Sequence, residues 1–325
     1  MAPYAAPWWL PGGHLQTMYA LLSVLRPRVD YRRERWEIPD GDFVDVDWLH
    51  EDSRSAAPDS ARKPLVVLFH GLEGGSRSQY AHALMAETAR RGCRGVVVHF
   101  RGCGGAANRL PRAYHSGDSA ELDWILRRLR DEHGAPVYAV GVSLGGNVLL
   151  KWLGERSSGA SAVVERAVAV SAPIDLMAAG EALGRGFNIV YTRIFLSTLK
   201  RKSLAKLEHH PQLYDAALVR RARTLREFDN VVTAPLHGFR DTDDYWTRAS
   251  SKPWLALIEV PTLILNARND PFLPEEALPD ARHVSTLVTL EFPQEGGHVG
   301  FVSGAFPGNL SWLPDRILEF FGLRA

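Results

Sequence analysis

The amino-acid sequence predicts an α/β protein in which helices cover both faces of a mostly parallel central sheet. Two observations predict this fold class: short apolar runs rich in β-branched residues recur along the chain, and helical patterns lie between them. Repetition of strand and helix is typical of a parallel sheet with right-handed crossovers. The runs are continuously apolar rather than alternating, which indicates strands buried on both faces.

The first two strands are predicted to form an antiparallel hairpin. Residues 32–38 and 43–49 flank Pro39-Asp40-Gly41-Asp42, a cluster typical of turns. A polar loop is expected over residues 53–64. Six further strands are predicted at 65–69, 95–100, 137–142, 167–170, 262–266 and 287–292, and the main helices at 79–91, 117–133, 144–155 and 309–321.

A long interruption separates the sixth predicted strand from the seventh. Residues 175–251 have helical patterning and no strong buried strand. We interpret this segment as a helical cap placed over the edge of the sheet. The expected organisation is therefore a core formed by residues 1–174, which include an aromatic N-terminal segment, and by residues 252–325, with the cap at 175–251 inserted between them.

Composition excludes several classes of protein. The chain has 325 residues, 46% of them apolar, and 38 Lys and Arg balance 37 Asp and Glu, which is typical of a soluble globular protein rather than a disordered one. A nucleic-acid partner is not expected, because neutralising phosphates requires a basic surplus. Cys93 and Cys103 are too few for a disulfide framework and lack the spacing of a zinc site, so we expect a cytoplasmic protein without a bound metal.

Neither an export signal nor a membrane span is expected at the N-terminus from the sequence. The longest apolar runs, such as 66–69 and 96–98, are far shorter than the roughly 18 residues that cross a bilayer. Residues 7–10 and 14–25 nevertheless form an aromatic and apolar stretch that could lie on a membrane surface as a peripheral contact. The simpler interpretation is a helix packed on the protein body, because no Lys or Arg precedes Arg26.

The strongest chemical signal is Gly141-Val142-Ser143-Leu144-Gly145, which fits the Gly-x-Ser-x-Gly pattern of a nucleophile elbow. Such an elbow needs a strand entering a sharp turn and a helix leaving it, and both are predicted around Ser143. The glycines make room in a strained turn where side chains would collide. An ordinary strand-to-helix turn with an N-capping serine is the alternative.

A serine hydroxyl needs a base to remove its proton and a carboxylate to orient that base. His298 follows the last predicted strand, on a loop at the carboxyl edge of the sheet, and is the best candidate for the base. Asp270 follows the preceding strand, and the order Ser143, Asp270, His298 is the one expected on an α/β-hydrolase scaffold. Asp175, after the sixth strand, is the rival acid.

Acyl transfer also requires donors aimed at the developing oxyanion. The backbone N–H groups of Leu144, after the nucleophile, and of Leu72, in the glycine-rich loop after the third strand, are the expected donors. A phosphate cradle is the competing interpretation of that loop, but the Gly-Lys-Ser/Thr ending of a P-loop is missing. Cys103, in another tight turn, is interpreted as a small residue in a crowded place rather than as a second nucleophile.

Taken together, these motifs resemble the YheT-like branch of the α/β-hydrolase superfamily, AB hydrolase family 4, a group of serine esterases. The resemblance rests on segments that run nearly from end to end of the chain: residues 9–21, 70–74, 100–105, 114–117, 141–147, 228–229 with Pro235 and Gly238, 269–271 and 296–301. It implies a triad of Ser143, Asp270 and His298, and activity toward short or medium acyl esters, including monoacylglycerols. At Asp244-Tyr245-Trp246 the family pattern would have paired tyrosines, and Trp246 departs from it.

The sequence therefore predicts a serine hydrolase that cleaves carboxylic esters of small molecules without a cofactor. Three alternatives stay open: an acyltransferase using an alcohol in place of water, a peptidase or thioesterase on the same triad, and a non-catalytic ligand-binding protein of the same fold. Apolar cap residues are candidates for the acyl pocket, although helical spacing also fits the core of the cap. They are Phe187, Ile189, Tyr191, Ile194, Phe195 and Leu199.

Overall fold

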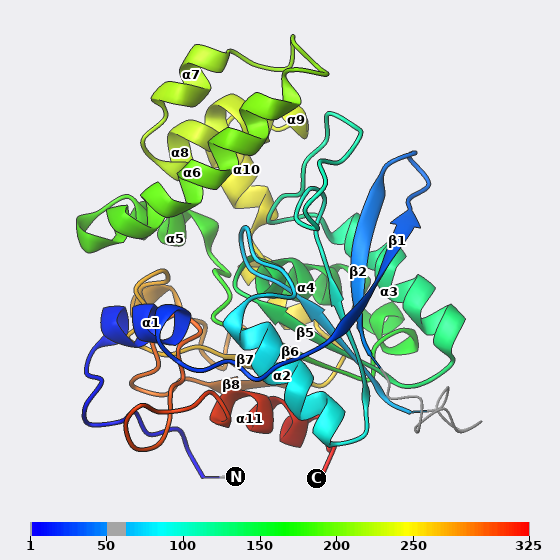
Figure 1. The fold of residues 1–325 in the computed structure, drawn as a ribbon, viewed down its shortest axis with the longest axis vertical. Helices are drawn as coiled ribbons and strands as arrows, with labels where there is room; N and C mark the ends of the chain where they lie inside the picture. The colour runs from blue at the N-terminus through cyan, green and yellow to red at the C-terminus, as the bar shows by residue number, and fades with distance from the viewer. Residues whose placement is uncertain (1, 51–62, 325) are drawn as a thin grey trace.

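A computed structural model describes residues 2–50 and 63–324 of the chain (Figure 1). Most of the polar loop expected over residues 53–64 lies outside the described residues. Eight strands form one sheet in the order β1-β2-β4-β3-β5-β6-β7-β8. They are β1 (Tyr31–Glu37), β2 (Phe43–Leu49), β3 (Leu65–Phe69), β4 (Arg94–Val98), β5 (Val137–Val142), β6 (Arg166–Val170), β7 (Thr262–Leu265) and β8 (Val288–Glu291).

The predicted sheet is confirmed. β1 and β2 pair as an antiparallel hairpin, β2 pairs antiparallel with β4, and every later pair is parallel. β3 and β5 occupy the middle of the sheet, and every residue of β3 is buried. This burial explains why the strand is continuously apolar in sequence.

Two hydrophobic cores lie on opposite faces of the sheet, because successive side chains of a strand point to opposite sides. One face packs against α3 (Ser119–His133) and α4 (Leu144–Arg156), and the other against α2 (Gln79–Arg90) and α11 (Trp312–Phe320). Val67 belongs to the first core, whereas its neighbours Val66 and Leu68 belong to the second. The prediction of helices on both faces is therefore confirmed.

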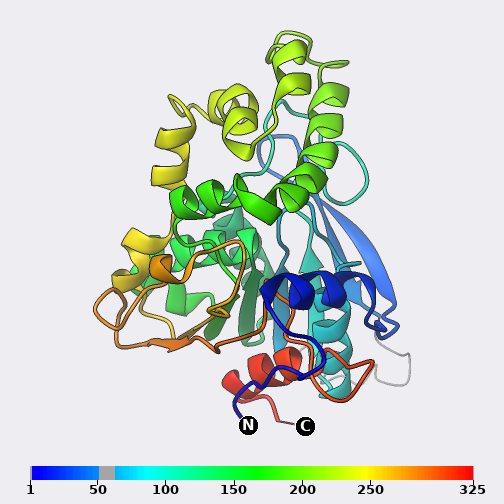
Figure 2. The ribbon, with the colours of Figure 1, turned by 90° about the vertical axis from the view of Figure 1, so that its left-hand side faces the viewer.

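Residues 175–251 are fully described and hold helices but no strand, as the sequence pattern indicates. The α-helices are α5 (Leu176–Leu183), α6 (Ile189–Lys206), α7 (Ala216–Arg221), α8 (Leu225–Phe228), α9 (Ala234–Leu236) and α10 (Thr242–Ala249). They connect β6 to β7 and lie together on one side of the sheet in both ribbon views (Figures 1 and 2). The division of the chain into core and cap remains a prediction.

The N-terminal segment forms α1 (Gly13–Leu22), a helix that packs on the protein body (Figure 2). Its buried residues are Gln16, Thr17 and Ala20, whereas Leu22 is 70% exposed. One side of the helix therefore contacts the loops near the carboxyl edge of the sheet, and its other side carries uncovered leucines.

Two helices begin later than the sequence pattern predicts. The helix expected from residue 309 begins at Trp312, because Asn309 pairs with Ser303 in an isolated bridge and its side chain accepts a hydrogen bond from the Ser311 N–H group. The helix expected from residue 117 begins at Ser119.

Candidate active site

Ser143 lies in the turn between β5 and α4 with φ 52° and ψ −120°. Residues other than glycine rarely adopt this backbone conformation. A Cβ atom added to Gly141 would come within 2.5 Å of the Gly145 carbonyl oxygen, and one added to Gly145 within 2.4 Å of the Phe69 carbonyl oxygen. Only glycine fits at either position. The spacing of the pentapeptide thus reflects two steric constraints around the serine.

The loops that follow β7 and β8 bring an acid and a histidine to this serine. His298 Nε2 lies 3.0 Å from Ser143 Oγ, and His298 Nδ1 lies 2.9 Å from Asp270 Oδ2. The Asp270 carboxylate is buried and also accepts a hydrogen bond from the Phe272 N–H group at 2.8 Å. The phenyl ring of Phe272 stacks on the imidazole with ring centroids 4.0 Å apart. The structure therefore brings together the three residues that the sequence singles out.

Asp175, the rival acid, has a different environment. It is the N-cap of α5, where its carboxylate accepts a hydrogen bond from the Ala178 N–H group at 3.1 Å. The other carboxylate oxygen lies 3.3 Å from Lys252 Nζ. The structure gives Asp270, and not Asp175, the contact with His298.

The two expected oxyanion donors line the same pocket as Ser143 and His298. Leu144 is the first residue of α4, where backbone N–H groups have no partner within the helix. Leu72 belongs to the loop after β3, and a Cβ atom on the adjacent Gly71 would lie 3.1 Å from Ser143 Cβ. The loop backbone thus passes directly beside the serine.

Sequence reasoning assigned no role to two residues of α1 that hold the loop after β8, the histidine loop, which carries His298. Thr17 Oγ1 accepts a hydrogen bond from the His298 N–H group at 2.8 Å and donates one to the Gly13 carbonyl at 2.7 Å. Gln16 Oε1 accepts one from the Gly296 N–H group at 2.8 Å. A signal was present, since Gln16 and Thr17 are adjacent polar residues in an otherwise mostly apolar stretch.

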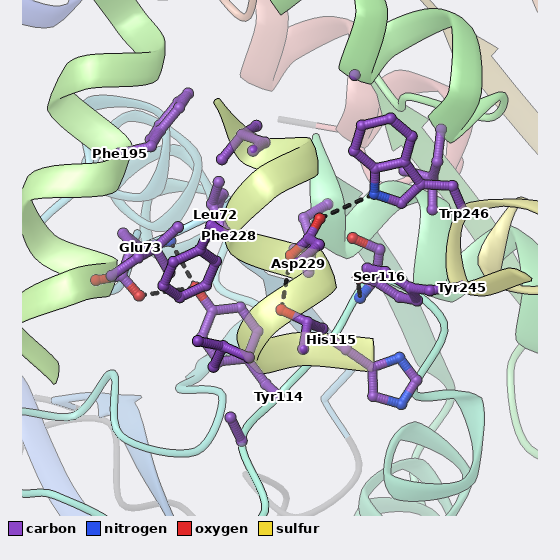
Figure 3. A pocket seen from close by; sticks show the side chains of 18 of the residues that line it. Leu72, Glu73, Tyr114, His115, Ser116, Phe195, Phe228, Asp229, Tyr245 and Trp246 are labelled. Atoms are coloured by element: carbon purple, nitrogen blue, oxygen red, sulfur yellow. Dashed lines mark hydrogen bonds between the residues drawn. The ribbon is translucent and has the colours of Figure 1, made fainter. Parts of the chain in front are cut away.

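The pocket beside Ser143 encloses about 170 Å³ and is lined by residues of the loops that follow the strands and of helices α5, α6, α8, α9 and α10. Figure 3 shows part of this lining. Of the six cap residues predicted as candidates, Phe195 and Leu199 line it. The other four do not: Tyr191 is buried against Phe272, whereas Phe187, Ile189 and Ile194 face outward. Helical spacing could not separate these roles, because each depends on how α6 packs. The apolar lining also includes Leu176, Leu183, Leu225, Phe228, Val232, Leu236, Tyr245 and Trp246.

Trp246, where the sequence departs from the family pattern, contributes to this wall. Its indole Nε1–H donates to Asp229 Oδ2 at 2.9 Å (Figure 3), and its ring packs so tightly on α5 that a Cβ atom at Gly180 would lie 2.3 Å from it. Asp229 accepts a second hydrogen bond from Thr233 Oγ1 at 2.6 Å. Burial raises the pKa of the Asp229 carboxyl to about 6.

Cys103 does not have the environment of a nucleophile. Burial raises the pKa of its thiol to about 12, so the sulfur stays protonated near neutral pH. Its Sγ atom lies 3.6 Å from Lys202 Nζ and 4.0 Å from Glu73 Oε1. These contacts agree with its interpretation as a small residue in a crowded turn.

Two features are absent from residues 2–50 and 63–324. No helix there is both long and apolar enough to cross a membrane. No three His, Cys, Asp or Glu side chains within those ranges are grouped as metal ligands would be.

Comparison with known proteins places this geometry in context. The family model described as "alpha/beta hydrolase fold" matches residues 64–305. The chain is 41% identical over 310 residues to "Putative esterase YheT" of Escherichia coli (strain K12), covering 94% of this chain and 89% of that protein. It is 31% identical over 309 residues to "Phospholipase ABHD3" of Mus musculus, covering 94% of this chain and 74% of that protein. Among solved structures, Est1E from Butyrivibrio proteoclasticus with bound ferulic acid superposes with a TM-score of 0.55 at 13% identity, covering 90% of this chain and 97% of that one.

Proposed function

This chain is a carboxylic ester hydrolase that belongs to the α/β-hydrolase family, and from that premise we propose that it acts through an acyl-enzyme on Ser143. The observation that carries the proposal is the continuous chain of hydrogen bonds from Asp270 through His298 to Ser143 Oγ, with distances of 2.9 and 3.0 Å. Such a chain is what an otherwise weak hydroxyl nucleophile requires.

In the proposed mechanism, His298 Nε2 takes the proton of Ser143 as Oγ attacks the ester carbonyl carbon. Asp270 accepts the Nδ1–H hydrogen bond, fixes the tautomer and stabilises the imidazolium. The tetrahedral intermediate collapses when His298 gives the proton to the leaving alcohol. Water then enters, loses a proton to His298 and attacks the acyl carbon, so that the acid is released and the Ser143 hydroxyl is restored.

The developing negative charge falls on the carbonyl oxygen, and we assign its stabilisation to the backbone N–H groups of Leu72 and Leu144. Each lies on a loop or helix end that is fixed before substrate arrives, which is the condition for a large electrostatic contribution. Neither donor depends on its side chain.

The substrate is proposed to be an ester with a short or medium acyl chain, including monoacylglycerol-like molecules. Two features support this: the wall of the pocket is mostly apolar, and its volume of about 170 Å³ is below the 300–1,000 Å³ of typical ligand sites. Residues 175–251 are proposed to act as a cap, since they supply most of that wall. A series of p-nitrophenyl esters with two to sixteen acyl carbons would locate the preferred length.

The decisive experiment replaces Ser143 by alanine. Ser143→Ala should abolish both p-nitrophenyl ester hydrolysis and labelling by a fluorophosphonate, with an unchanged circular dichroism spectrum. Ser157→Ala is a matched control, because Ser157 lies at the other end of α4 and also has a positive φ, of 46°. Hydrolysis that persists in Ser143→Ala contradicts the assignment. Absence of both labelling and turnover in the native protein would instead favour the ligand-binding alternative, and ester formation with added alcohols would favour the acyltransferase.

Peripheral membrane contact by the N-terminal segment is a further part of the proposal. It is supported by the exposure of Trp8 (91%), Leu22 (70%) and Leu25 (88%), which leaves an uncovered apolar surface on this segment. In a sedimentation assay with phosphatidylglycerol-containing vesicles, Leu22→Ser/Leu25→Ser should weaken binding. The same substitution at Leu257, which is 49% exposed and distant in sequence, should not. Equal binding by all variants would contradict the contact. A cytoplasmic location stays a prediction from cysteine usage.

A further inference from the structure

The loop after β3 holds one unpaired backbone donor among several paired ones. The N–H group of Gly71 donates to Tyr80 Oη at 2.9 Å, that of Glu73 to Tyr114 Oη at 3.0 Å and that of Gly74 to the Gly71 carbonyl at 2.9 Å. From Gly71 to Gly75, Leu72 alone has an N–H group without an acceptor among the described residues. Its direction is therefore set by the contacts of its neighbours.

Glu73, directly after this donor, has an unusual backbone. Its φ is 56°, in the left-handed region that costs a residue with a side chain about 1–2 kcal/mol. Such a conformation persists only where surrounding contacts hold it. Tyr114 provides two of those contacts, because its hydroxyl oxygen accepts from the Glu73 N–H group and its O–H donates to Glu73 Oε1 at 2.8 Å (Figure 3).

The third contact comes from α6, 129 residues further along the chain. Lys202 Nζ lies 2.9 Å from the Glu73 carboxylate, whose side chain is only 8% exposed. A carboxylate buried to this degree loses much of its hydration, and removal of its cation leaves a charge that the site does not compensate. The loss would act directly on the residue next to Leu72.

We propose that Glu73, Tyr114 and Lys202 are positioning residues that fix the Leu72 N–H group toward the oxyanion. The position of α6, which carries Lys202, then affects the orientation of the loop after β3. The inference rests on the proposed function, since it gives Leu72 its role there. None of the three side chains needs to touch the reacting atoms. Their effect is on a donor that matters most when negative charge develops, and therefore on the transition state more than on bound substrate.

Lys206, one turn later on α6, offers a matched comparison. Its Nζ lies 2.9 Å from Asn108 Oδ1 and makes further hydrogen bonds of 2.9–3.0 Å to the carbonyls of Leu110, Pro111 and Arg112. It ties the same helix to a different loop and has no hydrogen bond to residues 71–75 among the described residues. Loss of either lysine perturbs the attachment of α6, but only Lys202 acts on Glu73.

The test compares Lys202→Met, Lys206→Met and Lys202→Arg with the native enzyme. Complete loss of one oxyanion donor costs roughly 10²–10³ in kcat. A displaced donor should cost less, so Lys202→Met is expected to lower kcat about 10- to 100-fold. KM should change less than about threefold, since ground-state binding gains little from this donor. Affinity for a trifluoromethyl ketone, whose serine adduct carries an oxyanion, should fall by the same factor as kcat.

Lys202→Arg keeps a cation for Glu73 and should recover most of the lost kcat. Lys206→Met should lower the unfolding temperature about as much as Lys202→Met does. Its affinity for the trifluoromethyl ketone, relative to its affinity for substrate, should stay like that of the native enzyme. The proposal is overturned if Lys202→Met retains native kcat and ketone affinity, or if Lys206→Met loses both by an equal factor. An active Ser143→Ala enzyme would instead contradict the proposed function, so failure of the positioning proposal and failure of the proposed function are distinguishable.

Discussion

Replacing Thr17 by valine should slow ester hydrolysis, although this residue lies on α1, 281 positions before the histidine that it supports. Thr17 Oγ1 accepts the His298 N–H hydrogen bond and is anchored in turn by its own bond to the Gly13 carbonyl. Valine keeps the shape of threonine but removes both bonds. The N–H group of the proposed catalytic base would then face a methyl group.

The size of the effect follows from the cost of an unpaired buried amide, about 1–3 kcal/mol. The histidine loop can relieve that cost by moving so that the amide reaches another acceptor. Each 1.4 kcal/mol that favours the moved loop lowers the fraction of enzyme molecules with His298 in its active position about tenfold. We therefore expect kcat/KM of Thr17→Val to fall between about fivefold and a hundredfold. The unfolding free energy should fall by no more than about 3 kcal/mol.

The assay is steady-state hydrolysis of a p-nitrophenyl ester, with urea unfolding measured on the same samples. Thr17→Ser is the control, because serine retains the oxygen and loses only a methyl group. It should stay within about threefold of the native kcat/KM, since a buried methyl contributes about 1 kcal/mol mainly to stability. Native kcat/KM in Thr17→Val, or an equal loss in Thr17→Ser, would refute the reasoning.

Two further predictions concern an acid and a buried histidine. Asp270→Asn should lower kcat by about 10³–10⁴, as loss of the orienting acid does in serine hydrolases. Asp175→Asn should leave kcat within about twofold and change stability little, because the asparagine amide oxygen can still cap α5. Comparable kcat values for the two variants would reverse the assignment. Burial lowers the pKa of His70 to about 3, because it disfavours the charged ring. In the neutral ring, Nδ1–H donates to the Gly71 carbonyl and Nε2 accepts from the Phe100 N–H group. Between pH 6.5 and 3 the unfolded chain binds a proton that the folded chain does not, so acid should reduce stability by up to about 1.4 kcal/mol per pH unit for this group. Urea unfolding at pH 7.5 and 5 measures how much unfolding free energy the protein loses on acidification. This loss should be smaller in His70→Asn than in the native protein, and an equal loss would exclude His70 as a cause of the acid sensitivity.

The strands, the main helices and the serine turn could be predicted from sequence because each is determined locally. Strand β5 is apolar over six residues, and the turn after it needs glycine at 141 and 145 for steric reasons that act within a few residues. His298 and Asp270 could be predicted because parallel strands deliver their following loops to one edge of the sheet. These are properties of short segments and of topology.

The pocket wall and the supporting contacts could not be predicted in the same way. Phe195 and Ile194 are adjacent and both apolar, yet the first lines the pocket and the second is 49% exposed. Their roles depend on the orientation of α6 relative to the sheet, which no local pattern encodes. The ion pair between Glu73 and Lys202 likewise joins residues that are 129 positions apart.

The histidine loop shows why such long-range polar contacts matter for the site. Three successive backbone N–H groups, at 296, 297 and 298, donate to the side chains of Gln16, Asn269 and Thr17 at 2.8, 2.9 and 2.8 Å. A helix or strand would satisfy these amides with its own backbone, but this loop relies on side chains from two distant segments. Gln16 also accepts from Asn269 Nδ2 at 3.1 Å. The loop after β7, which carries Asp270, and the histidine loop are therefore both hydrogen-bonded to Gln16 of α1. The distance between Asp270 and His298 is thus set in part by a helix that contains neither residue.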